Sequence, residues 1–187
     1  MSCNLTQGRQ EVCKESVGGL QGVYFLNYTT GSQGGEFTGY SPNSTPAGLI
    51  TELPSGSTVY YYELKGTSAY TETVNSSREN GTTFFTQELT LNLKKLTNEM
   101  TTQLKTLAYG RPQIIVWTKN GDSFIAGLAE GCDLTAGSIS TGAGMGDLYG
   151  YSITMQGEEH YPATFLSGST TSSPFAGLTT QPAIVFN

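Results

Sequence analysis

Histidine and carboxylates come together at one place in the sequence, where His160 follows Glu158 and Glu159. Such a trio could supply a general base or ligands for a metal ion. A zinc site needs three or four convergent ligands, and the chain has no H-E-x-x-H or C-x-x-C spacing. A surface histidine just beyond a strand is therefore the favoured interpretation.

Nucleophilic chemistry has equally little support. No G-x-S-x-G sequence is present to expose a serine on a nucleophile elbow. A cysteine nucleophile would need Cys3, Cys13 or Cys132 to meet His160, and no spacing points to such a pair. The 15 acidic residues would supply candidate carboxylate pairs of the glycosidase type in any fold, so that signal is weak.

Two further stretches could bind ligands. Residues 142–146 (GAGMG) could cradle a phosphate, but a phosphate loop needs a following helix, and residues 148–155 look like a strand. The Walker lysine is also missing, so a turn between strands is favoured. Tyr60, Tyr61 and Tyr62 could stack on sugars or bases, although packing is the more ordinary use of tyrosine. The sequence thus predicts a protein that is not an enzyme, with no metal and no cofactor.

Charge is sparse and negative. Charged residues make up 13% of the chain, about half the usual share, and the formal net charge is −6. The nine basic residues are scattered, with only Lys94 and Lys95 adjacent. Proteins that hold nucleic acid neutralise phosphates with clustered Lys and Arg, so neither tight DNA binding nor an anionic membrane surface is expected.

Cysteine number and hydropathy favour a protein of the reducing cytosol that is not secreted. Three cysteines do not make a disulfide framework, and reduced thiols are expected, although whether Cys3 and Cys13 pair stays open. The N-terminus lacks the basic start and apolar run of a signal peptide. No stretch approaches the roughly 20 apolar residues that cross a bilayer, so no membrane partner is expected.

The elements that would carry any site are mostly strands. Strands are predicted at 20–28, 57–66, 68–74, 82–94, 131–142 and 148–158, with a turn at 75–81. Residues 113–119 and 122–128 flank Asn120-Gly121, the strongest short-range hairpin signal. One helix is predicted at about 97–109, with Thr97 as N-cap and a left-handed Gly110 closing it. Its apolar face is formed by Met100, Leu104, Leu107 and Ala108.

The clearest pattern lies in residues 82–94. Two sets of side chains alternate there, as in a strand with one face in a core. The apolar set is Phe85, Leu89, Leu91 and Leu93, together with Gln87. The polar set is Thr86, Glu88, Thr90 and Asn92.

Around these elements the chain divides into three parts. Residues 1–19 are predicted to form an extended N-terminal arm, and residues 20–160 a single β-rich domain. Residues 161–187 are predicted to form a flexible C-terminal tail. The domain contains a Gly/Ser/Thr/Pro-rich loop at 29–56, which is longer than a compact domain needs and therefore calls for a purpose.

The second half of the chain resembles tail tube proteins of tailed bacteriophages. The resemblance rests on residues 84–89 (FFTQEL), 107–112 (LAYGRP) and 142–148 (GAGMGDL), supported by 16–20 and 70–73. It implies a mainly β fold: a β-sandwich or half-barrel of antiparallel strands with one packed α-helix, long loops and terminal arms. It also implies a virion protein that is assembled in the cytoplasm of the bacterial host.

The resemblance implies a homo-oligomer, with hexameric rings stacked into a tube that meets other tail proteins. DNA would pass through the channel without specific binding, and a neutral or acidic wall suits that passage. Thr86, Glu88, Thr90 and Asn92 are the candidates for the channel wall. The candidates for contacts between rings lie in the long loop: Gly34, Phe37, Tyr40, Leu49 and Ile50.

Two alternatives remain open. One is another virion or assembly protein, such as a capsid decoration protein, a tail terminator or an injection-system tube. The other is a carbohydrate-binding module or hydrolase that uses the tyrosine-rich strand.

Overall fold

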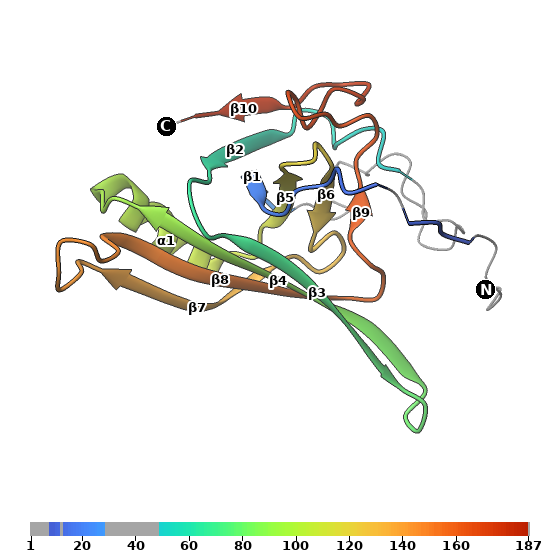
Figure 1. Cartoon of the computed structure of the whole chain (residues 1–187), viewed down its shortest axis with the longest axis horizontal. Coiled ribbons are helices and arrows are strands. Elements are labelled where there is room, and N and C mark those ends of the chain that lie inside the picture. Colours follow the sequence, from blue (N-terminus) through green and yellow to red (C-terminus); the bar gives the residue numbers. More distant parts are fainter. Residues whose placement is uncertain (1–7, 12, 29–48, 187) are drawn as a thin grey trace.

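The computed structural model describes residues 8–11, 13–28 and 49–186, and within them the chain is mainly β (Figure 1). One sheet has the strand order β10-β2-β1-β5-β6-β9 and the other β3-β4-β8-β7. The strands are β1 (Leu20–Leu26), β2 (Thr58–Glu63), β3 (Ala69–Ser77), β4 (Thr82–Lys94), β5 (Gln113–Thr118), β6 (Ser123–Ala126), β7 (Asp133–Ser140), β8 (Gly150–Glu159), β9 (Thr164–Phe165) and β10 (Ala183–Val185), and the helix is α1 (Asn98–Tyr109). The predicted mainly β fold with one helix is confirmed.

The two sheets pack as a sandwich with an extra layer. Alternate residues of β1 and β5, such as Val23 and Val116, face β4 and β8 in one core cluster. The intervening residues, such as Tyr24 and Ile115, face a second core cluster on the opposite side of the same sheet. Burial on both faces explains why these two strands are apolar almost throughout rather than alternating.

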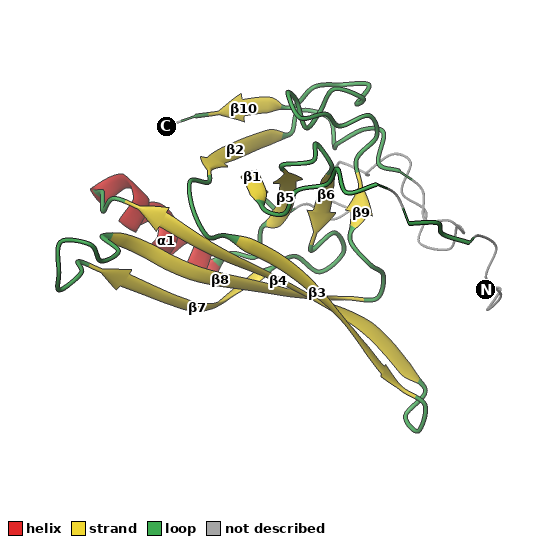
Figure 2. Ribbon diagram, in the orientation of Figure 1, coloured by secondary structure: helices red, strands yellow, loops and turns green. Residues whose placement is uncertain are grey.

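Helix α1 completes the first core cluster at one end of the four-stranded sheet (Figure 2). The Thr97 hydroxyl accepts a hydrogen bond from the Met100 N–H at 3.1 Å, which confirms the predicted N-cap. Met100, Leu104 and Leu107 pack against the cluster while half-buried, and no residue of the helix is fully buried. The predicted left-handed closure is wrong, because Gly110 is extended at φ −97°.

A long hairpin projects from the four-stranded sheet (Figure 1). We expected a turn at 75–81, but β3 continues to Ser77 and the turn is only Arg78–Gly81. Strand β8 supports β4 only as far as the Phe85–Glu159 pair. Residues 75–84 therefore extend beyond the body as a two-stranded ribbon, which we call the hairpin arm.

The segment after residue 160 is not a free tail. It contributes β9 and β10 to the six-stranded sheet, and Leu166, Phe175 and Leu178 are buried in the second core cluster. It also crosses the β5–β6 hairpin, where a side chain at Gly121 would collide with the Thr171 backbone. The expectation of a flexible tail at 161–187 is therefore wrong for these packed residues, because their apolar side chains cover a sheet face that would otherwise meet water.

Candidate functional site

The outer face of the four-stranded sheet carries the predicted wall residues. In β4, Gln87, Leu89, Leu91 and Leu93 are buried, so the alternate residues point away from the core. Paired residues of neighbouring strands project on the same side, so the register defines the whole surface, which we call the polar sheet face. Its central members are Ala69, Thr71 and Thr73 of β3; Thr86, Glu88, Thr90 and Asn92 of β4; Ser152, Thr154, Gln156 and Glu158 of β8; and Asp133, Ala136 and Ser138 of β7. The register continues the face to Phe84 at one end of β4 and to Lys94 at the other.

The chemistry of the central part of the polar sheet face is uniform. Lys94 and Phe84 lie at the two ends of this face. Its central members include no lysine, arginine, histidine or aromatic residue, and their ionisable groups are the carboxylates of Glu88, Glu158 and Asp133. Such a surface offers no stacking platform for bases and no cations for phosphates. It suits weak, repulsive contact with a polyanion.

The four predicted wall residues differ in whether their side chains are held by hydrogen bonds within the subunit. The Thr86 hydroxyl accepts a hydrogen bond from the Asn75 amide at 2.7 Å. The Asn92 amide donates to the Thr67 carbonyl at 2.6 Å. These two side chains therefore fix the sheet and its connections, whereas Glu88 is exposed and is the charged member of the four.

Both edges of this sheet are open in the described part of the chain. Strand β3 forms one edge and β7 the other, and each pairs with a single strand. Neither contains lysine, arginine or proline, residues with which natural edge strands discourage pairing. Strand β7 has one irregularity, between Leu134 and Ala136, and then runs regularly to Ser140. Both edges are therefore available to another strand.

The predicted ring-contact residues of the long loop do not form one surface. Gly34, Phe37 and Tyr40 lie outside the described residues. Leu49 is half-exposed, but Ile50 is fully buried and forms a parallel bridge with Leu166. Ile50 is therefore a core residue, and its assignment as a contact between rings is wrong.

The other candidates for chemistry are dispersed. His160 is exposed and its ring lies beside Tyr161, and no group of three or more metal-ligating residues occurs in the described ranges. Burial raises the pKa of the Cys132 thiol to about 12, helped by nearby Glu159 and Asp133, so this thiol stays protonated. Cys13 is a free, exposed thiol, and Cys3 is not among the described residues.

The glycine-rich turn is filled by its own carboxylate. The Asp147 carboxylate accepts hydrogen bonds from the Ala143 and Gly144 N–H groups at 2.9 and 2.7 Å. These hydrogen bonds lower the pKa of Asp147, so it remains ionised. The N–H groups that a phosphate would need are thus already used, which favours a structural turn.

The tyrosine run packs rather than forming a stacking platform. The Tyr61 ring lies 4.8 Å from Tyr24, and the Tyr62 ring lies edge-on to Phe25 at 4.9 Å. Tyr60 alone is exposed. Alternate sides of one strand separate these rings, as expected from the period of two.

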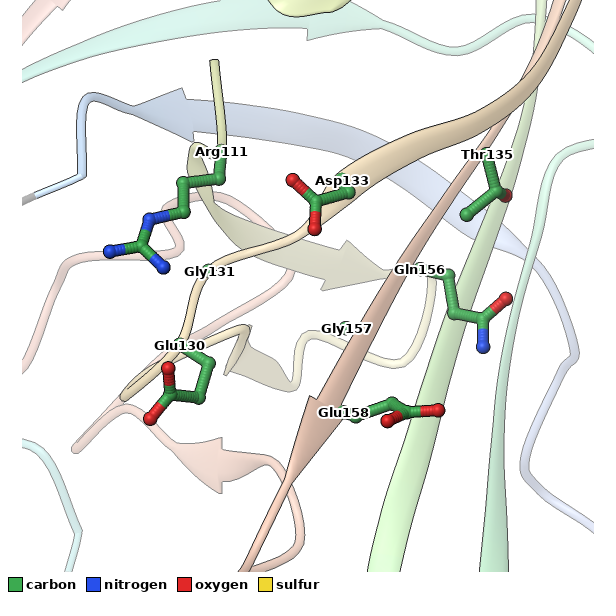
Figure 3. A pocket seen from close by; sticks show the side chains of 8 residues that line it. All are labelled: Arg111, Glu130, Gly131, Asp133, Thr135, Gln156, Gly157 and Glu158. Atoms are coloured by element: carbon green, nitrogen blue, oxygen red, sulfur yellow. The ribbon is translucent and has the colours of Figure 1, made fainter. Parts of the chain in front are cut away.

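A mixed-charge hollow of about 440 Å³ opens beside β7 and β8 (Figure 3). Arg111, Glu130, Asp133 and Glu158 line it without forming ion pairs, since the ion pair found among the described residues joins Lys65 and Glu63. The Arg111 guanidinium instead sits 4.3 Å from the centre of the Tyr28 ring. The hollow borders the polar sheet face, and none of the polar side chains that line it is buried.

A buried polar anchor ties this sheet to the rest of the molecule. The Gln87 amide donates to Glu72 at 3.1 Å and its oxygen accepts from the Gly127 N–H at 2.8 Å. The Glu159 carboxylate, 5% exposed, accepts from the Ala129 and Glu130 N–H groups at 2.9 Å each. These contacts fix the loop between β6 and β7, and with it the β7 edge.

Burial raises the pKa of Glu159 above its usual value of 4.5, and the Glu130 carboxylate adds to this effect, while the two N–H donors oppose it. A raised pKa in the folded state means that the contribution of Glu159 to stability is fully present below 4.5 and is lost as pH rises through the folded pKa. Glu159→Gln keeps an oxygen for both N–H groups but does not titrate. The free energy of unfolding of the wild type is therefore expected to fall relative to that of Glu159→Gln as pH rises above about 4.5.

The exposed neighbour supplies the control for this prediction. Glu158→Gln removes an exposed carboxylate at the neighbouring position and controls for the change in net charge, with the free energy of unfolding measured by urea unfolding at each pH. Parallel profiles for the wild type and Glu159→Gln would contradict the predicted linkage.

The side of β8 that faces outward can be read from its own sequence, although its pairing with β4 cannot. In 150–159, Tyr151, Ile153 and Met155 are buried and alternate with Ser152, Thr154 and Gln156, the same pattern that identified β4. The contribution of β3 and β7 depends on pairing and could not be read locally.

Comparisons with protein-family models, with curated proteins and with solved structures returned no match. No helix in the described ranges is both long enough and apolar enough to span a bilayer. Function must therefore be argued from the geometry of this chain.

Proposed function

We propose that the protein is the structural subunit of a bacteriophage tail tube. Six copies form a ring, rings stack into a tube, and DNA passes through the channel without specific binding. The tube belongs to the virion, assembles in the bacterial host cytoplasm and joins other tail proteins at its ends. The observation that carries this proposal is a sheet face whose central part bears carboxylates and no cation or aromatic ring, bounded by two edges that are open within the described part of the chain.

The strand directions support closure into a ring. The order β3-β4-β8-β7 is antiparallel at every step, so β3 and β7 run in opposite directions. Rotation about a symmetry axis then places β7 of one copy antiparallel to β3 of the next. This heterologous pairing repeats identically around the ring and leaves no open edge.

The size of such a ring suits a DNA conduit. Six four-stranded sheets, with strands about 4.8 Å apart and tilted by about 35–45°, close into a wall roughly 45–50 Å across between backbones. With the polar sheet face turned inward, the channel admits a DNA duplex and presents carboxylates to its phosphates. The opposite face of the sheet carries the apolar core and cannot line water.

The oligomeric state tests the proposal. Native mass spectrometry and negative-stain images of the purified protein should show hexameric rings or tubes with an open channel. A protein that stays monomeric at all accessible concentrations, or that forms particles without a channel, would be inconsistent with a tail tube.

A further inference from the structure

The hairpin arm ends the four-stranded sheet with exposed apolar and charged side chains. Val74 at its base is 61% exposed and Phe84 is 37% exposed. Arg78 and Glu79 occupy the turn at its tip, and both are exposed. A two-stranded ribbon has little stability by itself, so an arm of this length with uncovered apolar side chains indicates a binding partner.

The opposite end of the same sheet also carries exposed apolar and charged side chains. The connection between β7 and β8 and the end of β7 expose three apolar side chains there: Ile139, Met145 and Tyr149. Lys95 adds a positive charge, and its N–H donates to the Tyr149 carbonyl at 2.7 Å. Asp147 adds a negative charge that its lowered pKa preserves.

These two ends lie at opposite extremes of the molecule (Figure 1). The two ends therefore cannot contact each other within one subunit. They can make contact between two subunits that point in the same direction. Arg78 and Glu79 on the arm are complementary in charge to Asp147 and Lys95 at the other end, and apolar side chains flank both pairs.

We infer that the hairpin arm of one copy binds the β7–β8 turn of a second copy placed head-to-tail along the sheet. A heterologous contact of this kind repeats without closing and builds a filament. The inference rests on the proposed tube, within which it assigns the contact between rings to the hairpin arm and the turn at 141–149. It provides the ring contact that the buried Ile50 cannot.

Two variants test this contact. Met145→Asp places a charge on a fully exposed side chain in the turn. A second variant replaces residues 76–83 by Asn-Gly, a two-residue hairpin loop, and leaves the supported part of β4 intact. Each should retain hexameric rings in native mass spectrometry but raise the protein concentration needed for tubes, seen by pelleting and negative stain, by about tenfold or more.

Tyr109→Asp is the matched control, because Tyr109 is also a large, highly exposed side chain but lies at the end of α1. It should form tubes at the wild-type concentration. Tubes that form normally from either test variant, or rings lost together with tubes, would overturn the arm-to-turn contact. A wild-type protein without rings would instead overturn the proposed function, so the two failures are distinguishable.

Discussion

Assembled particles carrying Glu88→Lys are expected to retain DNA or eject it more slowly at low salt. Glu88 is exposed in the middle of the polar sheet face, and a sixfold ring would convert six carboxylates into six cations around the channel. Each phosphate that a lysine neutralises steepens the dependence of log affinity on log salt by about 0.9. Ejection triggered in vitro and followed by dye fluorescence should therefore recover as salt rises.

Two substitutions separate charge from position in this experiment. Glu88→Gln removes the carboxylate without adding a cation and should eject DNA at close to the wild-type rate. Glu63→Lys makes the same charge change on β2, in the other sheet, and should leave ejection unchanged. Normal ejection from fully assembled Glu88→Lys particles at low salt would remove this face from the channel wall.

Phe175→Ala is expected to lower the free energy of unfolding of the subunit by about 3–5 kcal/mol. The Phe175 ring is 1% exposed and meets Tyr24 edge-on at 5.0 Å between ring centres. Its removal leaves a cavity between the C-terminal segment and the six-stranded sheet, which close packing cannot easily fill. Urea unfolding of the monomeric subunit, followed by circular dichroism, measures the loss.

A second phenylalanine in the same segment gives the comparison. Phe186 is 65% exposed, although its ring lies 5.5 Å from Tyr61, so Phe186→Ala should cost less than about 1 kcal/mol. Equal and small losses for the two variants would mean that the segment after residue 160 is detachable, as the sequence had suggested.

The contrast between these segments shows where local patterns are informative. Strand β4 and helix α1 were predicted nearly to the residue, because the period of two, the Thr97 cap and the apolar spacing of Met100, Leu104 and Leu107 are local signals. Gly110 was placed correctly at the helix end but in the wrong conformation, since an extended exit toward β5 also satisfies its N–H through the Thr106 carbonyl.

The prediction for the residues after 160 was wrong because their structure depends on distant contacts rather than on local signals. Their composition of Ser, Thr, Gly and Pro suggested a tail, and nothing local indicates that Leu166, Phe175 and Leu178 meet a sheet formed much earlier in the chain. The same holds for Ile50, whose partner Leu166 is distant in sequence. Few apolar residues suffice to hold such a segment when each of them is fully buried.

The sequence by itself determined that this protein is β-rich and acidic, that β4 has one polar face, and that no catalytic motif is present. Only the tertiary structure decided that β3, β7 and β8 extend that face, that its two edges are open among the described residues, and that the sheet ends in a projecting arm. The physical reason is that alternation along one strand assigns side chains to a face, whereas the neighbours of that strand are chosen by pairing between distant segments. A surface built from four strands exists only once those pairings have formed.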